Sequence, residues 1–433
     1  MRKWWPLIAV CAGSFLFLLD TTVVTVALPR IGADLTASVG QLQWVPDVYT
    51  LVLAVLMLAA GSLADRRGAR RVFVAGLAVF GAASAACGLA PDIGTLIAAR
   101  GVQAIGGAAL AVTGFAVLTA SYEGRARGTA ISVFFAVSGL GAAAGPLVGG
   151  VLTEYFGWPA IFFVNVPLAS ATAVFAVAAI RRDVPARRGR FDLAGAAWFA
   201  VAAASLVHGL TLGDSGHWTS PVTLGALGVS AVAFAVFGVV ERRPDPLLDL
   251  RLFRDRGFTT LVACAAASTL TFAALVYVSL WLGPSSPVEA GLALAPLAVA
   301  SFLTSTLLGR FLHRFPPRLL LGAGVLLGAL GCVLLLVAGV PAGLAVTGIG
   351  VGIAGPATGA AIAAAAPPGR AGMAAGILTT TRQFGQTLGV AVLGIAYQAG
   401  GLRPVYFAAA ACGAVAGLLA LLPLPHKQAR VPA

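Results

Sequence analysis

Long apolar segments alternate with short polar ones along the whole chain, and this alternation predicts a series of transmembrane helices. A helix needs about 18 or more predominantly apolar residues to cross a bilayer. Fourteen such segments follow one another, and the residues between them suffice only for short loops, so we expect no sizeable soluble domain. The predicted spans are Leu7–Leu28, Tyr49–Ala64, Val72–Leu89, Leu96–Ala120, Thr129–Leu152, Ala160–Ile180, Leu193–Leu212, Val222–Val240, Phe258–Leu282, Val288–Leu312, Leu319–Val340, Leu344–Ala366, Ala374–Tyr397 and Pro404–Leu422.

The composition agrees with this pattern and excludes several classes of protein. Of the 433 residues, 59% are hydrophobic and only 10% are charged, whereas a soluble domain carries about 25% charged residues. A water-soluble fold of this size needs a polar surface that these residues do not supply. The composition therefore excludes a soluble enzyme, a nucleic-acid-binding domain and a disordered scaffold, and it favours an all-α polytopic membrane protein.

The basic residues indicate how the spans are oriented. The formal net charge is +13, and 24 of the 28 Lys and Arg residues fall in segments that a cytoplasmic N-terminus would place on the inner side. This asymmetry obeys the positive-inside rule, so both termini are predicted to be cytoplasmic. Because the basic residues are divided among many short loops, they do not indicate a nucleic-acid partner. Arg2 and Lys3 also resemble the start of a signal peptide, but no small-residue cleavage site precedes Asp20, so we expect an uncleaved first helix.

Two predicted inner loops resemble each other and indicate an internal duplication. Gly61–Arg70 and Gly309–Arg318 share a glycine and two arginines at matched positions, 248 residues apart (309 − 61). The loops follow the second and tenth spans, whereas a transporter duplicated from six helices would repeat after six. The offset predicts two additional helices between the halves: a six-helix bundle at 1–182, a two-helix insertion at 183–256 and a six-helix bundle at 257–433. The alternative is that turn glycines and inner arginines recur here by chance.

Two charged residues lie at matched depths within predicted spans. At about 1.5 Å per residue, Asp20 lies about 13 Å and Arg100 about 12 Å from the outer ends of their helices. Ionisable groups at such depths are costly and indicate a functional site. Removal from water favours the protonated form of Asp20, as a proton carrier requires. We hypothesise that Asp20 and Arg100 face one cavity and couple electrostatically; the alternative is two independent structural contacts, with Asp20 in a hydrogen bond or ion pair.

Three motifs identify a family. They are Gly61-Ser-Leu-Ala-Asp65-Arg66-Arg-Gly68-Ala-Arg70 in the first inner loop, Arg100-Gly-Val-Gln103-Ala-Ile-Gly106-Gly107 in the fourth span, and Gly141-Ala-Ala-Ala-Gly145-Pro146-Leu-Val-Gly149-Gly150 in the fifth span. On these motifs the chain resembles the fourteen-helix drug:proton antiporter branch of the major facilitator superfamily over essentially its whole length. The resemblance implies the major facilitator fold with fourteen helices arranged as 6+2+6.

The resemblance also implies a role for two of these motifs. The inner loop is implied to be a conformational latch rather than a substrate site, and its Asp65 is suited to pair with nearby arginines or to cap a helix N-terminus. The fifth-span motif is implied to mark an exporter rather than an importer. Its glycines allow helices to approach closely, and Pro146 removes a backbone donor and favours a kink.

Four further polar residues are candidates for the transport pathway. Gln103, Arg382 and Gln383 are candidate polar contacts of a central cavity, although Arg382 fits a buried structural ion pair equally well. Glu289 lies near the outer end of the tenth span. It is grouped with Asp20 and Arg100 as a candidate proton-coupling residue, and the alternative is a solvated charge at the rim.

The remaining residues offer no other chemistry. The sequence has no phosphate-binding glycine loop and no His or Cys spacing typical of a metal site, so we expect no cofactor, no metal and no enzyme activity. We predict an exporter of small amphipathic or cationic compounds, such as drugs and antibiotics, working by proton exchange and alternating access. The expected partners are substrate, protons and the lipid of a bacterial inner membrane, with the monomer as the working unit. The alternatives are a proton-coupled metabolite or siderophore carrier and a non-transporting membrane sensor.

Overall fold

The computed structural model describes residues 2–181, 191–213, 218–243, 245–278, 287–308, 311, 314–365 and 369–421, and every regular element in these ranges is a helix. The first group comprises η1 (Arg2–Trp4), α1 (Trp5–Asp34), α2 (Val39–Arg67), α3 (Ala69–Gly88), α4 (Ile93–Ser121), α5 (Gly124–Phe156), α6 (Ala160–Phe163) and α7 (Asn165–Ala179). A pair follows, α8 (Leu193–Leu212) and α9 (Pro221–Val240). The last group comprises η3 (Leu250–Arg254), α10 (Arg256–Phe272), η4 (Ala273–Tyr277), α12 (Pro287–Leu308), α13 (Pro317–Val337), α14 (Val340–Ala365), α15 (Ala371–Gly400) and α16 (Leu402–Leu421).

These elements make the fourteen spans that the hydropathy pattern predicts. The segments α6 with α7 and α10 with η4 each form one span, so six spans precede the α8–α9 pair and six follow it. Among the described residues, twelve helices are long and apolar enough to cross a membrane by length and composition. The predicted all-α polytopic fold with a 6+2+6 arrangement is confirmed.

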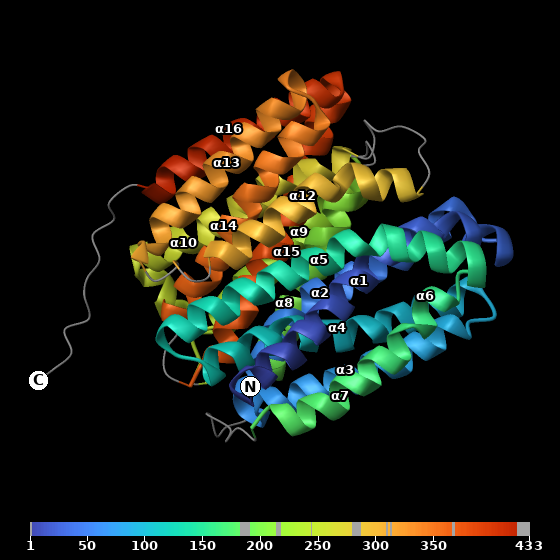
Figure 1. Ribbon diagram of the computed structural model, residues 1–433, viewed down its shortest axis with the longest axis horizontal. Coiled ribbons are helices and arrows are strands. Elements are labelled where there is room, and N and C mark those ends of the chain that lie inside the picture. The colour runs from blue at the N-terminus through green and yellow to red at the C-terminus, as the bar shows by residue number, and fades with distance from the viewer. Residues whose placement is uncertain are drawn as a thin grey trace, which may run out of the picture.

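The helices pack as two groups that run side by side (Figure 1). The first group, in blue to green, meets the last group, in yellow to red, where α2 and α4 contact α15 and where α5 contacts α12 and α14. Residues 66–71, 122–127, 241–243 and 245–256 lie at one end of the molecule, which we call the arginine-rich end. Both α1 and α15 begin at this end, because an even number of spans separates their first residues.

Two spans differ from their predicted form for local reasons. The second was predicted as the short span Tyr49–Ala64, but α2 runs over 29 residues because Ser38 and Gln41 form a capping box before its polar first turns. The sixth span is interrupted between α6 and α7. Pro167 has no N–H to donate to the Phe163 carbonyl, so the helix ladder weakens at this point.

The inserted pair α8–α9 packs on the flank where the two groups meet. The helix α8 contacts both α2 and α15. The ring of Phe199 on α8 lies 6.0 Å from that of Phe384 on α15, and the ring of Phe234 on α9 lies 6.2 Å from the same residue, measured between ring centroids. Aromatic pairs at these separations contribute specific packing energy beyond area burial. The pair is therefore anchored to the last group as well as to the first.

Candidate functional site

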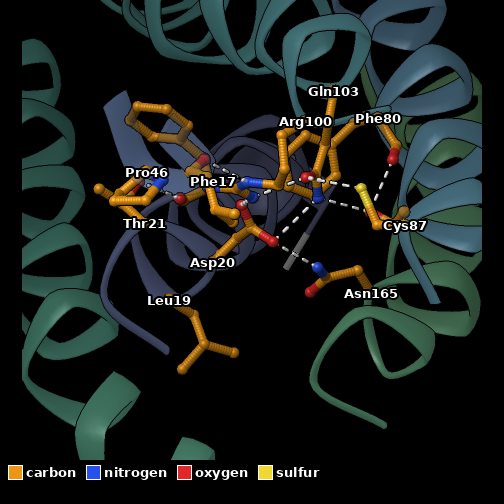
Figure 2. A network of polar contacts seen from close by, with 12 residues as sticks. Phe17, Leu19, Asp20, Thr21, Pro46, Phe80, Cys87, Arg100, Gln103 and Asn165 are labelled. Atoms are coloured by element: carbon orange, nitrogen blue, oxygen red, sulfur yellow. Dashed lines mark hydrogen bonds and ion pairs between the residues drawn. The ribbon is translucent and has the colours of Figure 1, made fainter. Parts of the chain in front are cut away.

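The most buried charges among the described residues form one network within the first group (Figure 2). Asp20 on α1 is 0% exposed and Arg100 on α4 is 1% exposed. Arg100 Nη1 donates to Asp20 Oδ2 at 2.6 Å. The other carboxylate oxygen, Asp20 Oδ1, accepts from Gln103 Nε2 at 2.9 Å and from Asn165 Nδ2 at 2.7 Å. The two charges thus share one network rather than making independent contacts, and three donors converge on the one carboxylate group.

Arg100 is enclosed by aromatic and backbone groups as well as by its ion pair. Its guanidinium carbon lies 4.0 Å from the centroid of the Tyr49 ring and 5.8 Å from that of Phe162. Its Nε donates to the Val45 carbonyl at 3.4 Å, and Nη1 also donates to Gln103 Oε1 at 2.6 Å. Cation–π contacts of this kind strengthen when water is excluded. The ion pair is therefore fully closed off from solvent in this conformation.

Sequence reasoning missed three members of this network. Asn165 begins α7 directly after the helix break, Ser84 Oγ accepts from Gln103 Nε2 at 2.7 Å, and Tyr49 covers Arg100. The signal for Asn165 was available, because it is an uncharged polar residue inside a predicted span and stands two positions before Pro167. Ser84 gave no such signal, since serine is common in transmembrane helices and can bond to its own backbone, as Ser84 also does to Phe80 at 2.7 Å.

A second polar contact joins the two groups at the arginine-rich end. Asp65, near the end of α2, accepts from the backbone N–H of Gly372 at 2.6 Å and from that of Met373 at 2.9 Å. These are among the first residues of α15, where N–H groups lack partners within the helix and the helix dipole favours negative charge. Gly61 and Gly372 pack backbone to backbone, because a Cβ at Gly61 would collide with the Gly372 carbonyl. The Asp65 carboxylate therefore caps a helix of the other group.

The other residues of the same loop contact different elements. Arg66 is 7% exposed, and its Nη2 donates to the Asp245 carbonyl, in the segment between α9 and α10, at 3.2 Å. Gly68 has φ of 93° and links α2 to α3, a conformation that favours glycine. Arg70 donates to the Val177 carbonyl of α7. The loop thus connects the first group, the last group and the connecting segment.

The segment between α9 and α10 carries a second link to α15 and a buried carboxyl group. Arg370, which precedes α15, pairs with Asp249 at 2.7 Å. Glu241, at the end of α9, is 3% exposed and accepts from the Leu248 N–H at 2.8 Å. Burial, with a contribution from the nearby Asp192 carboxylate, raises the pKa of Glu241 from its ordinary 4.5 to about 7.

The fifth-span motif forms the contact surface between α5 and α1. Gly141, Gly145 and Gly149 recur every four residues, and an added Cβ at any of them would collide with Phe15, Thr22 or Val23 of α1. Gly150 is buried beside them. Small residues at this spacing let two helices approach closely within a membrane.

Pro146 has a specific consequence at this contact. Because proline has no N–H, it leaves the Ala142 carbonyl, four residues earlier, without its helical donor. Thr22 Oγ1 on α1 donates to that carbonyl at 3.0 Å. The proline in α5 and the threonine in α1 therefore act as a pair, which joins the two helices at one fixed register.

Arg382 and Gln383 lie on α15, away from the Asp20 network. The Arg382 guanidinium carbon lies 5.0 Å from the centroid of the Phe135 ring on α5, so it faces the other group. Arg382 also lines a small cavity with Ser268 and Thr358. Gln383 is half-buried on the adjacent position of α15. The side chain of Glu289 lies outside the described residues, as do Gly309 and Arg310 of the second repeated loop.

Comparisons with known proteins place this architecture in context. The family model described as Major Facilitator Superfamily matches residues 10–284 and, a second time, residues 257–433. The chain is 36% identical to multidrug resistance protein Stp of Mycobacterium tuberculosis, over 90% of this chain and 74% of that protein. It is 37% identical to puromycin resistance protein pur8 of Streptomyces alboniger, over 90% and 81% of the two chains.

Two further relatives extend the comparison. The chain is 34% identical to the tetracenomycin C resistance and export protein of Streptomyces glaucescens, over 91% of this chain and 76% of that protein. Among solved structures, the human organic anion transporter MFSD10 (TETRAN) superposes with a TM-score of 0.71 over 96% of this chain and 99% of that chain. At 15% sequence identity, that superposition shows the shared fold alone.

Proposed function

Since the chain belongs to the Major Facilitator Superfamily, and is therefore a multi-pass membrane transporter rather than an enzyme, we propose that it exports small amphipathic compounds in exchange for protons. Relatives named for resistance to, or export of, puromycin and tetracenomycin C support drugs and antibiotics as the substrate class. The positive-inside rule supports a bacterial inner membrane with the arginine-rich end and both termini in the cytoplasm. The repeated halves need no second subunit to form a central pathway, which supports a monomer.

The observation that carries proton exchange is the Asp20–Arg100 pair. In the proposed cycle, Asp20 takes up a proton from outside and releases it inside. Neutralising Asp20 in this closed network would leave the Arg100 charge buried without a counter-charge, which costs several kcal/mol by order of magnitude. Proton uptake therefore favours a conformation in which Arg100 finds water or another partner, and this couples protonation to a change of shape.

The contact between α2 and α15 at the arginine-rich end stabilises a conformation that is closed to the cytoplasm. Asp65 and the glycines around it hold α2 against α15. We propose that this contact is the latch: it closes the cytoplasmic side here and opens when residues 1–182 rock against residues 257–433. Alternating access then exposes the central pathway first to one side of the membrane and next to the other.

Everted vesicles from a bacterium without its own drug pumps test the proposal. An imposed pH gradient, acid inside the vesicle, is expected to drive accumulation of a fluorescent drug by the wild-type protein. Asp20→Asn should abolish the gradient-driven part of transport while leaving drug exchange without a gradient in place, because the amide takes up no proton. Asp34→Asn is the matched control, since Asp34 lies on the same helix in a pair with Arg30 in which Asp34 is 42% exposed.

The outcomes separate the two parts of the proposal. If the wild type transports no drug in these vesicles and protects cells against none, the export function is wrong. If the wild type transports drug but Asp20→Asn retains full dependence on the pH gradient, Asp20 is not the proton carrier and the coupling mechanism must lie elsewhere.

A further inference from the structure

Arg382 lies deep within a membrane-spanning helix, and its guanidinium has no acidic partner among the described residues. It lies on α15, eleven residues after Ala371 (382 − 371), which is about 16 Å from the arginine-rich end of the helix. Its one described interaction is the cation–π contact with Phe135 at 5.0 Å. Charged groups at such a depth usually pair with an opposite charge or mark a substrate pathway.

The sequence of the C-terminal bundle explains why no carboxylate of the described residues pairs with Arg382. From residue 256 to residue 433 the only acidic residue is Glu289, in the first turn of α12. At the level of Arg382, α14 contacts α12 around Ser301, twelve residues further along (301 − 289), or about 18 Å along the helix axis. Asp20, the buried acid of the other bundle, already has Arg100, Gln103 and Asn165 as its donors.

Arg100 provides the contrast within the same molecule. The protein stabilises Arg100 with a carboxylate, an amide oxygen and a backbone carbonyl, and it excludes solvent completely. Among the described residues Arg382 has none of these partners; it is half-buried rather than fully buried, and its guanidinium faces Phe135 of the other group. An arginine presents five donors in a planar fork that matches a carboxylate. Arg382 therefore keeps its donors available in a place where water is scarce.

The walls of the adjoining cavity suit the rest of an amphipathic anion. Among its lining residues, Ser268, Thr269 and Thr358 present hydroxyl groups that donate their protons to carbonyls of their own helices, so their oxygens remain acceptors. Phe272 and Val351, on the same two helices, present apolar surface. The cavity thus combines a cationic fork, acceptor oxygens for ligand O–H or N–H groups, and apolar walls.

We propose that Arg382 is the recognition site for an anionic group, a carboxylate in the first instance, on the exported molecule. The carboxylate binds the guanidinium fork between α10, α14 and α15, and the apolar part of the molecule packs against Phe135 and Phe272. This inference rests on the proposed export function and narrows its substrates, which the sequence predicted as amphipathic or cationic compounds, to amphipathic organic anions. Because Phe135 belongs to the opposite bundle, the occupied site lies across the contact between the two bundles, and this contact must open during transport.

Three pyrene probes with similar chains and head groups of different charge test the site. Purified protein in lipid nanodiscs is titrated with 1-pyrenebutyrate, 1-pyrenebutanol and 1-pyrenebutylammonium, and binding is followed by pyrene fluorescence. We expect the butyrate to bind the wild type tightest. Arg382→Gln should weaken butyrate binding by about tenfold or more, because a charge-assisted pair is lost, and should leave butanol binding unchanged. Arg382→Lys should retain part of the butyrate preference, because it keeps the positive charge but loses the planar fork. Arg403→Gln, an exposed arginine at the start of α16, is the matched control.

Each outcome decides the proposal. It is overturned if the wild type binds the ammonium probe as well as the butyrate or better, if it binds no probe, or if Arg382→Gln weakens all three equally, as a general loss of structure would. The result is separable from the export function. If the protein transports drug along the gradient but binds no anion through Arg382, this inference alone is wrong. If it binds anions through Arg382 but transports no drug, the export function is wrong and the binding site remains supported.

Discussion

Removing the Asp65 carboxylate should open the arginine-rich end. Asp65 accepts two backbone hydrogen bonds from α15, at 2.6 Å from Gly372 and 2.9 Å from Met373, and no other described carboxylate caps that helix. Hydrogen bonds to a charged acceptor contribute about 1.5–3 kcal/mol each. The two bonds to Asp65 therefore stabilise the closed end by roughly 3 kcal/mol or more after allowance for water in the open state, which corresponds to about a hundredfold in the equilibrium.

The assay is a distance measurement between spin labels on the two bundles at this end. Arg71 at the start of α3 and Arg318 at the start of α13 are exposed and serve as labelling sites after substitution by cysteine. Cys412 is replaced first, and the other four native cysteines are buried. In Asp65→Ala we expect a second, longer distance to become substantially populated, because a hundredfold shift makes even a closed state favoured by about 99 to 1 nearly balanced with the open state.

A matched control separates the latch from helix capping in general. Asp92 caps α4 within its own bundle, where it accepts from the Thr95 N–H at 2.9 Å. Asp92→Ala should lower thermal stability without lengthening the distance between the labels. The reasoning is refuted if Asp65→Ala leaves the distance distribution unchanged, or if Asp92→Ala changes it equally.

Two further predictions concern stability. Raising the pH from about 5 to 8 should lower the apparent Tm, because folded Glu241, with a pKa of about 7, keeps a proton that the unfolded chain releases above its ordinary 4.5. The free energy of unfolding falls by at most about 3 kcal/mol. Glu241→Gln should flatten the dependence of Tm on pH. An unchanged dependence in this variant would show that Glu241 is not its source. Thr22→Val should lower stability by about 1–3 kcal/mol, since it leaves the Ala142 carbonyl without a donor. Restoring the helical donor with Pro146→Ala in the same chain should recover most of that loss, and a double variant as unstable as the single one would contradict the pairing.

The sequence predicted the spans better than it predicted their partners. Hydropathy located α8 at Leu193–Leu212 to the residue, because its ends are marked by Asp192 and by glycine. Hydropathy missed the first turns of α2, because these turns contain polar residues such as Gln41 and Asp47. The start of this helix is set by the Ser38 capping box. Burial depth singled out Asp20 and Arg100, because a charge in a membrane span is rare enough to be a signal by itself.

The remaining site residues depend on packing between distant segments. Asn165 reaches Asp20 across 145 positions, and Gly372 reaches Asp65 across 307. No local pattern encodes such a pairing, because it is decided by which helix faces which. The Ala142 carbonyl is an intermediate case. The sequence shows that Pro146 cannot donate to it, but not that Thr22 of another helix does.

The inserted pair α8–α9 makes the two lateral seams of the transporter unequal. On one flank, α8 covers the line where α2 meets α15, with Phe199 and Phe234 against Phe384. On the other flank, α5 meets α12, and within the described part of the chain neither α8 nor α9 packs against this pair. Among the described helices, the inserted pair therefore covers the α2–α15 seam and leaves the α5–α12 seam uncovered toward the bilayer. A substrate that enters from the bilayer is therefore expected to enter between α5 and α12, and the lipids beside these two helices form part of the entrance.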